Sequence, residues 1–158
     1  MKFKKIILVI LIIAVVICLC TYFFITIVKE EKGYLKVNDT IIKCNNVLIT
    51  SNSARVPFVQ LLLCLGADIK WENDNTADIT FKGIEYVLSL SDKKFTVKGS
   101  DYNYLLIPPG CTTGYSKVIE KDIILDIDTI RSVFCFMEYD VKITIDRGNS
   151  MVNITAIE

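Results

Sequence analysis

The longest uncharged stretch of the sequence runs from Ile6 to Val28. Its 23 residues are all apolar except Thr21 and Thr26. A helix of that length would extend about 35 Å, more than the ~30 Å hydrocarbon layer of a membrane. The sequence therefore predicts a transmembrane helix at residues 6–28, between a stub of residues 1–5 and a linker of residues 29–33.

A cleaved signal peptide is the competing interpretation of this stretch. Signal peptides have an apolar region of about 7–15 residues, followed by small residues at the cleavage site. Here the apolar run is longer, and residues 22–28 are mostly bulky. We therefore expect an uncleaved anchor that holds the chain in the lipid bilayer.

The charges that flank this segment predict its orientation. Lys2, Lys4 and Lys5 precede it, whereas residues 29–32 carry two lysines and two glutamates. Because positive charge is retained on the cytoplasmic side, the N-terminus is expected inside and residues 34–158 outside. The expected location is the cell membrane, as a single-pass protein with an extracellular C-terminal domain.

Charge and histidine content exclude several classes of function. The chain has 18 basic and 18 acidic side chains, so it lacks the basic surplus of a nucleic-acid binder. It contains no histidine, which excludes Ser-His-Asp and Cys-His catalytic pairs and histidine-ligated metals. We therefore assign no catalytic, cofactor-binding or metal-binding residue, and we expect no cofactor and no nucleic-acid partner.

Residues 34–158 have the pattern of a soluble domain built from short strands. Alternating apolar residues flank turn sequences, which is typical of β-hairpins. The predicted hairpins pair 34–37 with 40–43, 77–81 with 84–90, 95–97 with 104–106, 118–119 with 123–125, and 141–145 with 151–157. A further short strand is expected at residues 47–50.

Two segments have helical signals instead. Residues 58–65 follow Pro57, a favourable first helical position, and end at Gly66, a favourable C-terminal residue. Residues 127–137 follow Asp126, which is a candidate N-cap, and Asp128 suits the helix dipole. Two short helices packed on antiparallel hairpins give an α+β fold. The order of elements around the two helices is similar, which suggests a duplicated half-domain.

Several motifs resemble the copper amine oxidase N-terminal-like, or stalk, domain family of exported proteins of Gram-positive bacteria. The motifs are Val37-Asn38-Asp39, Arg55-Val56-Pro57, Leu65-Gly66-Ala67-Asp68-Ile69-Lys70-Trp71, Val97-Lys98-Gly99 and Pro108-Pro109. The second helical unit departs from the family pattern at Asp126, Glu138 and Ile143. The resemblance implies a five-stranded antiparallel sheet wrapped around a helix, and a domain that carries neither the copper nor the cofactor of the oxidases.

Four cysteines lie beyond the predicted anchor, at positions 44, 64, 111 and 135. Their spacing contains no C-x-x-C pair, so a zinc site is not expected. A disulfide is chemically allowed outside the cell, but the sequence does not choose among the three possible pairings. Cys64 and Cys135 lie among apolar residues and are expected to be buried thiols.

Acidic and aromatic residues supply the remaining candidate sites. Residues 72–78 resemble a calcium loop but lack its central glycine and final glutamate, so we expect a polar turn. Aromatic side chains could instead form a binding platform, and Tyr102 and Tyr104 alternate so that both rings face one side. The full set of aromatic candidates is Trp71, Tyr86, Tyr102, Tyr104 and Tyr115. Strand aromatics commonly pack in a core, so only Trp71, Tyr102 and Tyr104 are retained as candidate partner-binding residues.

These observations lead to an expected function. The favoured hypothesis is a membrane-anchored, non-enzymatic module that binds an envelope protein or a cell-wall polymer. A purely structural spacer, or a stalk that forms a homodimer, is a further hypothesis. The alternative is a small envelope enzyme that uses carboxylates or Cys111, which lies in the glycine-flanked segment 110–114.

Overall fold

The computed structural model describes residues 12–19, 31–42, 44, 46–50, 53–107 and 116–157. The chain divides into two compact units. The first comprises residues 1–30 and 50–52, and residues 12–19 within it are helical. The second comprises residues 31–49 and 53–158. Its described residues form an α+β domain, which confirms the predicted fold class.

Most of the predicted anchor, residues 6–28, lies outside the described residues, as do the stub 1–5 and residues 29–30 of the linker. Within the described part of the chain, no helix has both the length and the apolar character needed to span a bilayer.

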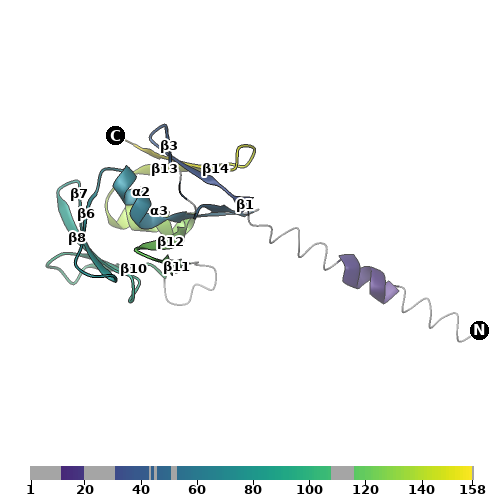
Figure 1. Cartoon of the computed structure of the whole chain (residues 1–158), viewed down its shortest axis with the longest axis horizontal. Coiled ribbons are helices and arrows are strands. Elements are labelled where there is room, and N and C mark those ends of the chain that lie inside the picture. Colours follow the sequence, from purple (N-terminus) through teal and green to yellow (C-terminus); the bar gives the residue numbers. More distant parts are fainter. Residues whose placement is uncertain are drawn as a thin grey trace, which may run out of the picture. The chain divides into compact units, whose positions relative to one another are not determined.

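The described residues of the second unit form three sheets, whose strands are labelled in Figure 1. The first is antiparallel, with the order β1 (Glu31–Lys32), β4 (Leu48–Ile49), β5 (Ala54–Pro57), β12 (Asp122–Asp126), β11 (Ser116–Ile119). The second is also antiparallel, with the order β10 (Asn103–Leu105), β9 (Lys94–Val97), β8 (Ile84–Ser89), β7 (Thr76–Phe81), β6 (Asp68–Trp71). The third has the order β13 (Val141–Asp146), β14 (Met151–Ala156), β2 (Tyr34–Val37), β3 (Thr40–Ile42).

The five predicted hairpins are confirmed. Two of them close through turns in which both central residues have positive φ, 44° and 69° at Asn38-Asp39 and 51° and 82° at Lys82-Gly83. This geometry matches the right-handed twist of the flanking strands, and Asn, Asp and Gly tolerate it best. Local turn chemistry therefore sets the register of these hairpins.

The antiparallel pattern does not extend to every neighbouring pair of strands. β14 and β2 are paired in parallel, with Met151 opposite Tyr34 and Ile154 opposite Val37. The sequence analysis made no prediction for this pair, because the two strands come from opposite ends of the domain and no turn sets their direction.

The two helices of this unit begin where strands of the first sheet end. α2 (Phe58–Cys64) directly follows β5, and α3 (Ile127–Phe136) directly follows β12. The sequence analysis treated Pro57 as a favourable first helical position. In the structure Pro57 is instead the N-cap, with φ −70° and ψ 118°, and the helix begins at Phe58. At α3 the predicted cap is confirmed, because the Asp126 carboxylate accepts hydrogen bonds from the backbone N–H groups of Asp128 (3.1 Å) and Thr129 (2.8 Å).

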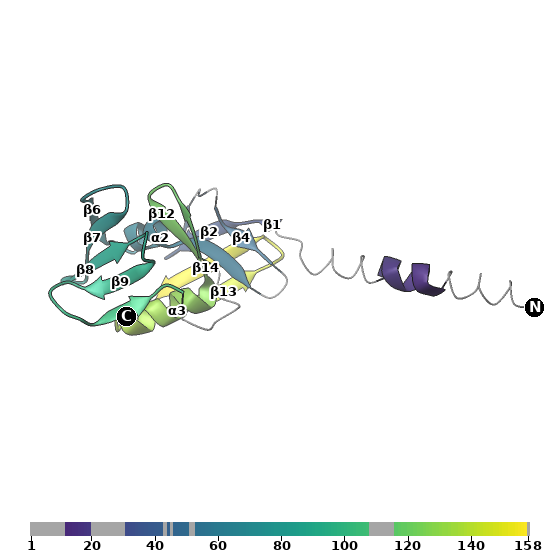
Figure 2. The ribbon, with the colours of Figure 1, turned by 90° about the horizontal axis from the view of Figure 1, so that it is seen from below.

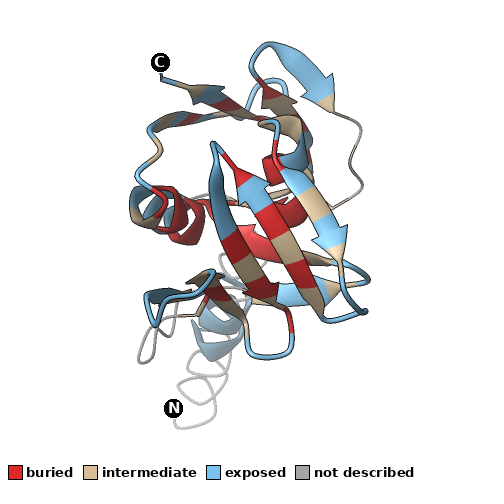
Figure 3. Cartoon of the chain, turned by 90° about the vertical axis from the view of Figure 1, so that its left-hand side faces the viewer, coloured by how far each residue is buried: buried red, intermediate tan, exposed pale blue. Residues whose placement is uncertain are grey.

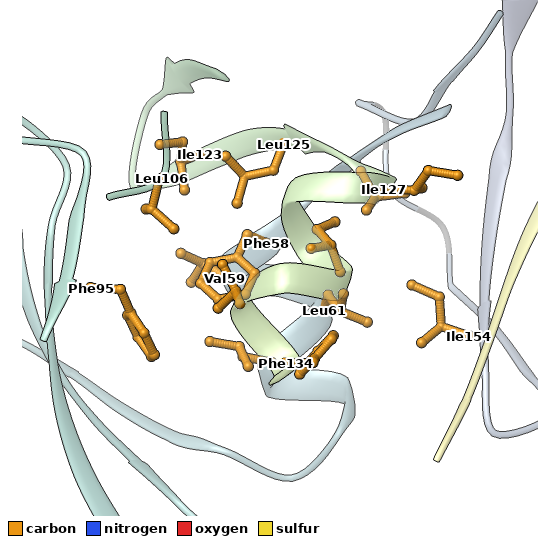
Figure 4. Close-up of a cluster of buried hydrophobic side chains, with 14 of the residues drawn as sticks. Phe58, Val59, Leu61, Phe95, Leu106, Ile123, Leu125, Ile127, Phe134 and Ile154 are labelled. Atoms are coloured by element: carbon orange, nitrogen blue, oxygen red, sulfur yellow. The ribbon is translucent and has the colours of Figure 1, made fainter. Parts of the chain in front are cut away.

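The core lies around the two helices, with the second sheet on one side and the third on the other (Figures 1 and 2). Figure 3 shows buried and exposed residues alternating along the strands, as expected for sheets with one face on a core. Figure 4 shows the core side chains of α2, α3, β9, β12 and β14 pointing toward one another, among them Phe58, Phe95, Leu125, Phe134 and Ile154.

Gly33 occupies a tight position at the junction of the first and third sheets. Its backbone N–H donates to the Val47 carbonyl (2.9 Å), and a Cβ atom here would lie 2.9 Å from the Ser150 carbonyl oxygen and 2.7 Å from Ile49 Cδ1. We expect Gly33→Ala to lower the free energy of unfolding by about 1–3 kcal/mol, because backbone must move to accommodate the methyl group. Urea denaturation measures this change.

Gly148→Ala is the matched control for that substitution. The nearest atom to its added Cβ is Asp146 Oδ1 at 3.5 Å, an ordinary contact distance. Equal stability of the two variants would contradict the close approach at Gly33.

Candidate functional site

A groove of about 390 Å³ lies beside α2. Its walls come from α2, the end of β6, the turn between β11 and β12, and the segment that precedes β4. The lining residues are Cys44, Asn46, Pro57, Val59, Gln60, Leu63, Trp71, Ile119, Glu120, Lys121 and Asp122. Apolar side chains, two amides and both signs of charge therefore line one concave surface.

Trp71 is the aromatic residue of this groove. It is the last residue of β6, where it pairs with Ala77 of β7, and it packs in part against the hydrophobic core. The Lys121 ammonium lies over its ring, 5.6 Å from the ring centroid, and is 3.2 Å from the Asp74 carboxylate. These contacts join the turn between β11 and β12 to the end of β6 and orient the indole.

Asp122 connects the groove to the start of α2. Its carboxylate accepts hydrogen bonds from the backbone N–H groups of Val59 (2.8 Å), Gln60 (3.1 Å) and Ile123 (2.7 Å). Burial raises the pKa of this carboxyl group above its ordinary value, and the backbone N–H donors oppose that shift. The carboxylate thus occupies the N-terminal end of α2 and acts as its cap, which Pro57 cannot do by a side-chain hydrogen bond.

Sequence analysis placed Asp122 in a turn and gave it no role. The sequence offers no local signal for the capping of α2 by Asp122, because Asp122 lies 63 residues from Val59. The pairing of β5 with β12 brings them together. Asn46, Gln60 and Glu120 were also missed, since polar residues on a helix or in a turn are ordinarily interpreted as solvent-exposed.

Two of the described thiols, those of Cys44 and Cys64, lie in partly buried surroundings. Burial raises the pKa of the Cys44 thiol in the groove and also that of the Cys64 thiol, which disfavours the reactive thiolate at both positions. Cys44, Cys64 and Cys135 are free thiols. Cys64 is only half-buried, and Cys135 is exposed on α3, so the prediction of a buried thiol is wrong for Cys135. Cys111 lies outside the described residues.

Tyr102 and Tyr104 form a second aromatic surface, separate from the lining of the groove. Both contact Phe136 near the end of α3: Tyr102 stacks on it with ring centroids 4.8 Å apart, and Tyr104 lies 5.8 Å from it at a tilt. Tyr102 keeps 63% of its surface exposed. The predicted common orientation of the two tyrosines is therefore confirmed, but they do not share the groove with Trp71.

The other sequence candidates have structural roles or lie outside the described part. Tyr86 is buried and stacks on Phe95, with ring centroids 4.8 Å apart. The segment 72–75 is a polar turn, in which Asn73 Oδ1 accepts from the backbone N–H groups of Asn75 and Thr76 at 2.8 Å each. Tyr115 and Pro108-Pro109 fall outside the described residues.

Comparison with protein-family models, with curated proteins and with solved structures gives no match for this chain.

Proposed function

We propose that the chain is a membrane-anchored, extracytoplasmic and non-enzymatic binding module that holds an envelope protein or a cell-wall polymer. The observation that carries the proposal is the groove beside Trp71. It combines an aromatic ring, aliphatic side chains and hydrogen-bonding groups on one concave surface, which is the composition typical of a ligand site. The Tyr102–Phe136 surface offers a second contact area for a larger partner.

The location rests on the uncharged segment 6–28 and on the lysines that precede it. The resemblance of residues 34–157 to the stalk-like domain of exported proteins supports the same location and a role in display. We expect the folded domain to face the exterior, where the groove can meet envelope components. In the alternative of a structural spacer or a homodimeric stalk, the domain would have a structural role and the groove would bind no ligand.

A duplicated half-domain is part of this proposal. Strand, helix and hairpin follow in the same order in β5–α2–β6–β7 and in β12–α3–β13–β14. β5 and β12 pair antiparallel at the centre of the first sheet, with Leu125 opposite Val56. The parallel contact between β14 and β2 then distinguishes the second copy from the first.

Capture from the native envelope tests the proposed function. The full chain, extracted from membranes in a mild detergent and immobilised, is expected to retain an envelope component reproducibly. Trp71→Ala should abolish most of this retention, because among the described lining residues Trp71 alone supplies an aromatic contact. Tyr34→Ala is the matched control, since Tyr34 is an exposed aromatic residue on β2 outside the groove. Equal retention by wild type and Trp71→Ala, or absence of the chain from membranes, would contradict the proposal.

A further inference from the structure

We propose that the groove beside Trp71 binds a saccharide that carries an acetamido group. This inference rests on the proposed binding function and specifies its ligand. It follows from four properties of the lining: the size of the groove, its exposed apolar surface, its two amide residues and its lack of an unpaired basic group.

The volume of the groove and its apolar residues indicate which ligands can contact it. A volume of about 390 Å³ is near the lower end of the range of small-ligand sites, so the groove suits a short chain segment of a few rings. Pro57 and Val59 are buried beneath it, and Leu63 at its edge keeps 49% of its surface exposed. Leu63 and the partly exposed Trp71 therefore offer apolar surface to the C–H faces of a sugar and to a methyl group.

The side-chain amides of the groove indicate which polar groups a ligand should carry. Asn46 and Gln60 line the groove, and each has a side chain with a carbonyl oxygen and an NH₂ group. Each can donate to a carbonyl and accept from an N–H, and these are the two polar groups of an acetamido substituent. Gln60 also lies on α2, whose first turn is fixed by Asp122, so its backbone is held in place before a ligand arrives.

The charges disfavour a strongly charged ligand. Asp122 already accepts the backbone N–H groups at the start of α2, so these donors are not offered to a phosphate. Lys121 is paired with Asp74, and Glu120 next to it has the opposite charge. The charged lining residues are thus two acidic groups and one basic group that already has a partner, which disfavours an anionic ligand and is compatible with a neutral one.

Trp71 is the only tryptophan of the chain, so its fluorescence reports on this groove alone. The experiment titrates the full chain, in a zwitterionic detergent without a sugar head group, with N,N′,N″-triacetylchitotriose. We expect a saturable change in tryptophan emission. Cellotriose, which has hydroxyl groups in place of the acetamido groups, should bind about tenfold more weakly or not at all, because it leaves the groove amides unpaired.

Gln60→Leu is the informative variant, because leucine keeps the helix propensity and the bulk of the side chain but removes the amide. It should weaken binding of the acetylated trisaccharide about tenfold, while the far-ultraviolet circular dichroism stays that of wild type. Tyr34→Ala, outside the groove, should bind as wild type does.

Three results would overturn the inference. They are an absent or unsaturable response to the acetylated trisaccharide, equal affinity for both trisaccharides, and wild-type affinity in a folded Gln60→Leu variant. If envelope capture still depends on Trp71 in any of these cases, the proposed binding function stands and only the ligand assignment fails. If the immobilised wild-type chain also captures no envelope component, the proposed binding function itself fails.

Discussion

Phe58→Ala is expected to lower the free energy of unfolding by about 3–5 kcal/mol, the range for removing a large aromatic side chain from a packed core. Phe58 is the first residue of α2 and is fully buried. Its ring meets that of Phe95 on β9 edge-on, with centroids 5.7 Å apart and an interplanar angle of 82°. The substitution therefore leaves a cavity between α2 and the second sheet. Guanidinium denaturation followed by circular dichroism measures the loss.

Phe58→Leu is the control for that prediction. It keeps most of the apolar volume, so the loss should be less than half of that for alanine, because the cost depends on the size of the residual cavity. Similar losses for both variants would show that the aromatic contact with Phe95, rather than the filled volume, stabilises the junction. A loss below about 1 kcal/mol for alanine would contradict the placement of Phe58 in the core.

Asp122→Ala is expected to lower the free energy of unfolding by about 2–4 kcal/mol. The substitution removes the cap of α2 and leaves the partly buried backbone N–H groups of Val59 and Gln60 without an acceptor, at a cost of about 1–3 kcal/mol for each group. Because α2 loses its hydrogen bonds to Asp122 beside Trp71, tryptophan fluorescence should also change before global unfolding. Thermal denaturation monitored by tryptophan emission and by circular dichroism separates the two effects.

Asp128→Ala is the matched control for Asp122→Ala. Asp128 is an exposed carboxylate near the start of the other helix, with an ion pair to Arg131 at 2.8 Å. Its loss should cost less than about 1 kcal/mol, because exposed ion pairs and dipole contacts contribute little. If the two variants were equally stable, the cap that Asp122 supplies to α2 would have no energetic importance.

Sequence reasoning predicted those features whose cause lies within a few residues. Asn38-Asp39 and Lys82-Gly83 have side chains or a glycine that accept positive φ, so their hairpins could be placed from the sequence. Asp126 caps the helix that starts at the next residue, and this too is a local effect. β5 was not predicted, because residues 54–57 read as the approach to a helix and their strand pairing depends on β4 and β12.

The candidate site was predicted only in part for the same reason. Trp71 was selected as an aromatic residue, and the structure places it in the groove. Tyr102 and Tyr104 were expected to share one face, which they do, but the sequence gave no information on their distance from Trp71. The partner of their rings, Phe136, lies on a different element and could not be inferred from the alternation of a strand.

The sequence by itself determined the α+β class, the hairpin turns and the cap of α3, since short-range sterics and hydrogen bonding decide these within a few residues. Its uncharged segment 6–28 likewise predicts an anchor from length and hydrophobicity alone. Only the tertiary structure decided that Asp122 caps α2, that β2 pairs with β14, and that Trp71, Gln60 and Asn46 line one groove. These contacts join residues far apart in the chain, and they are selected by the burial of a common core, which no short window of sequence contains.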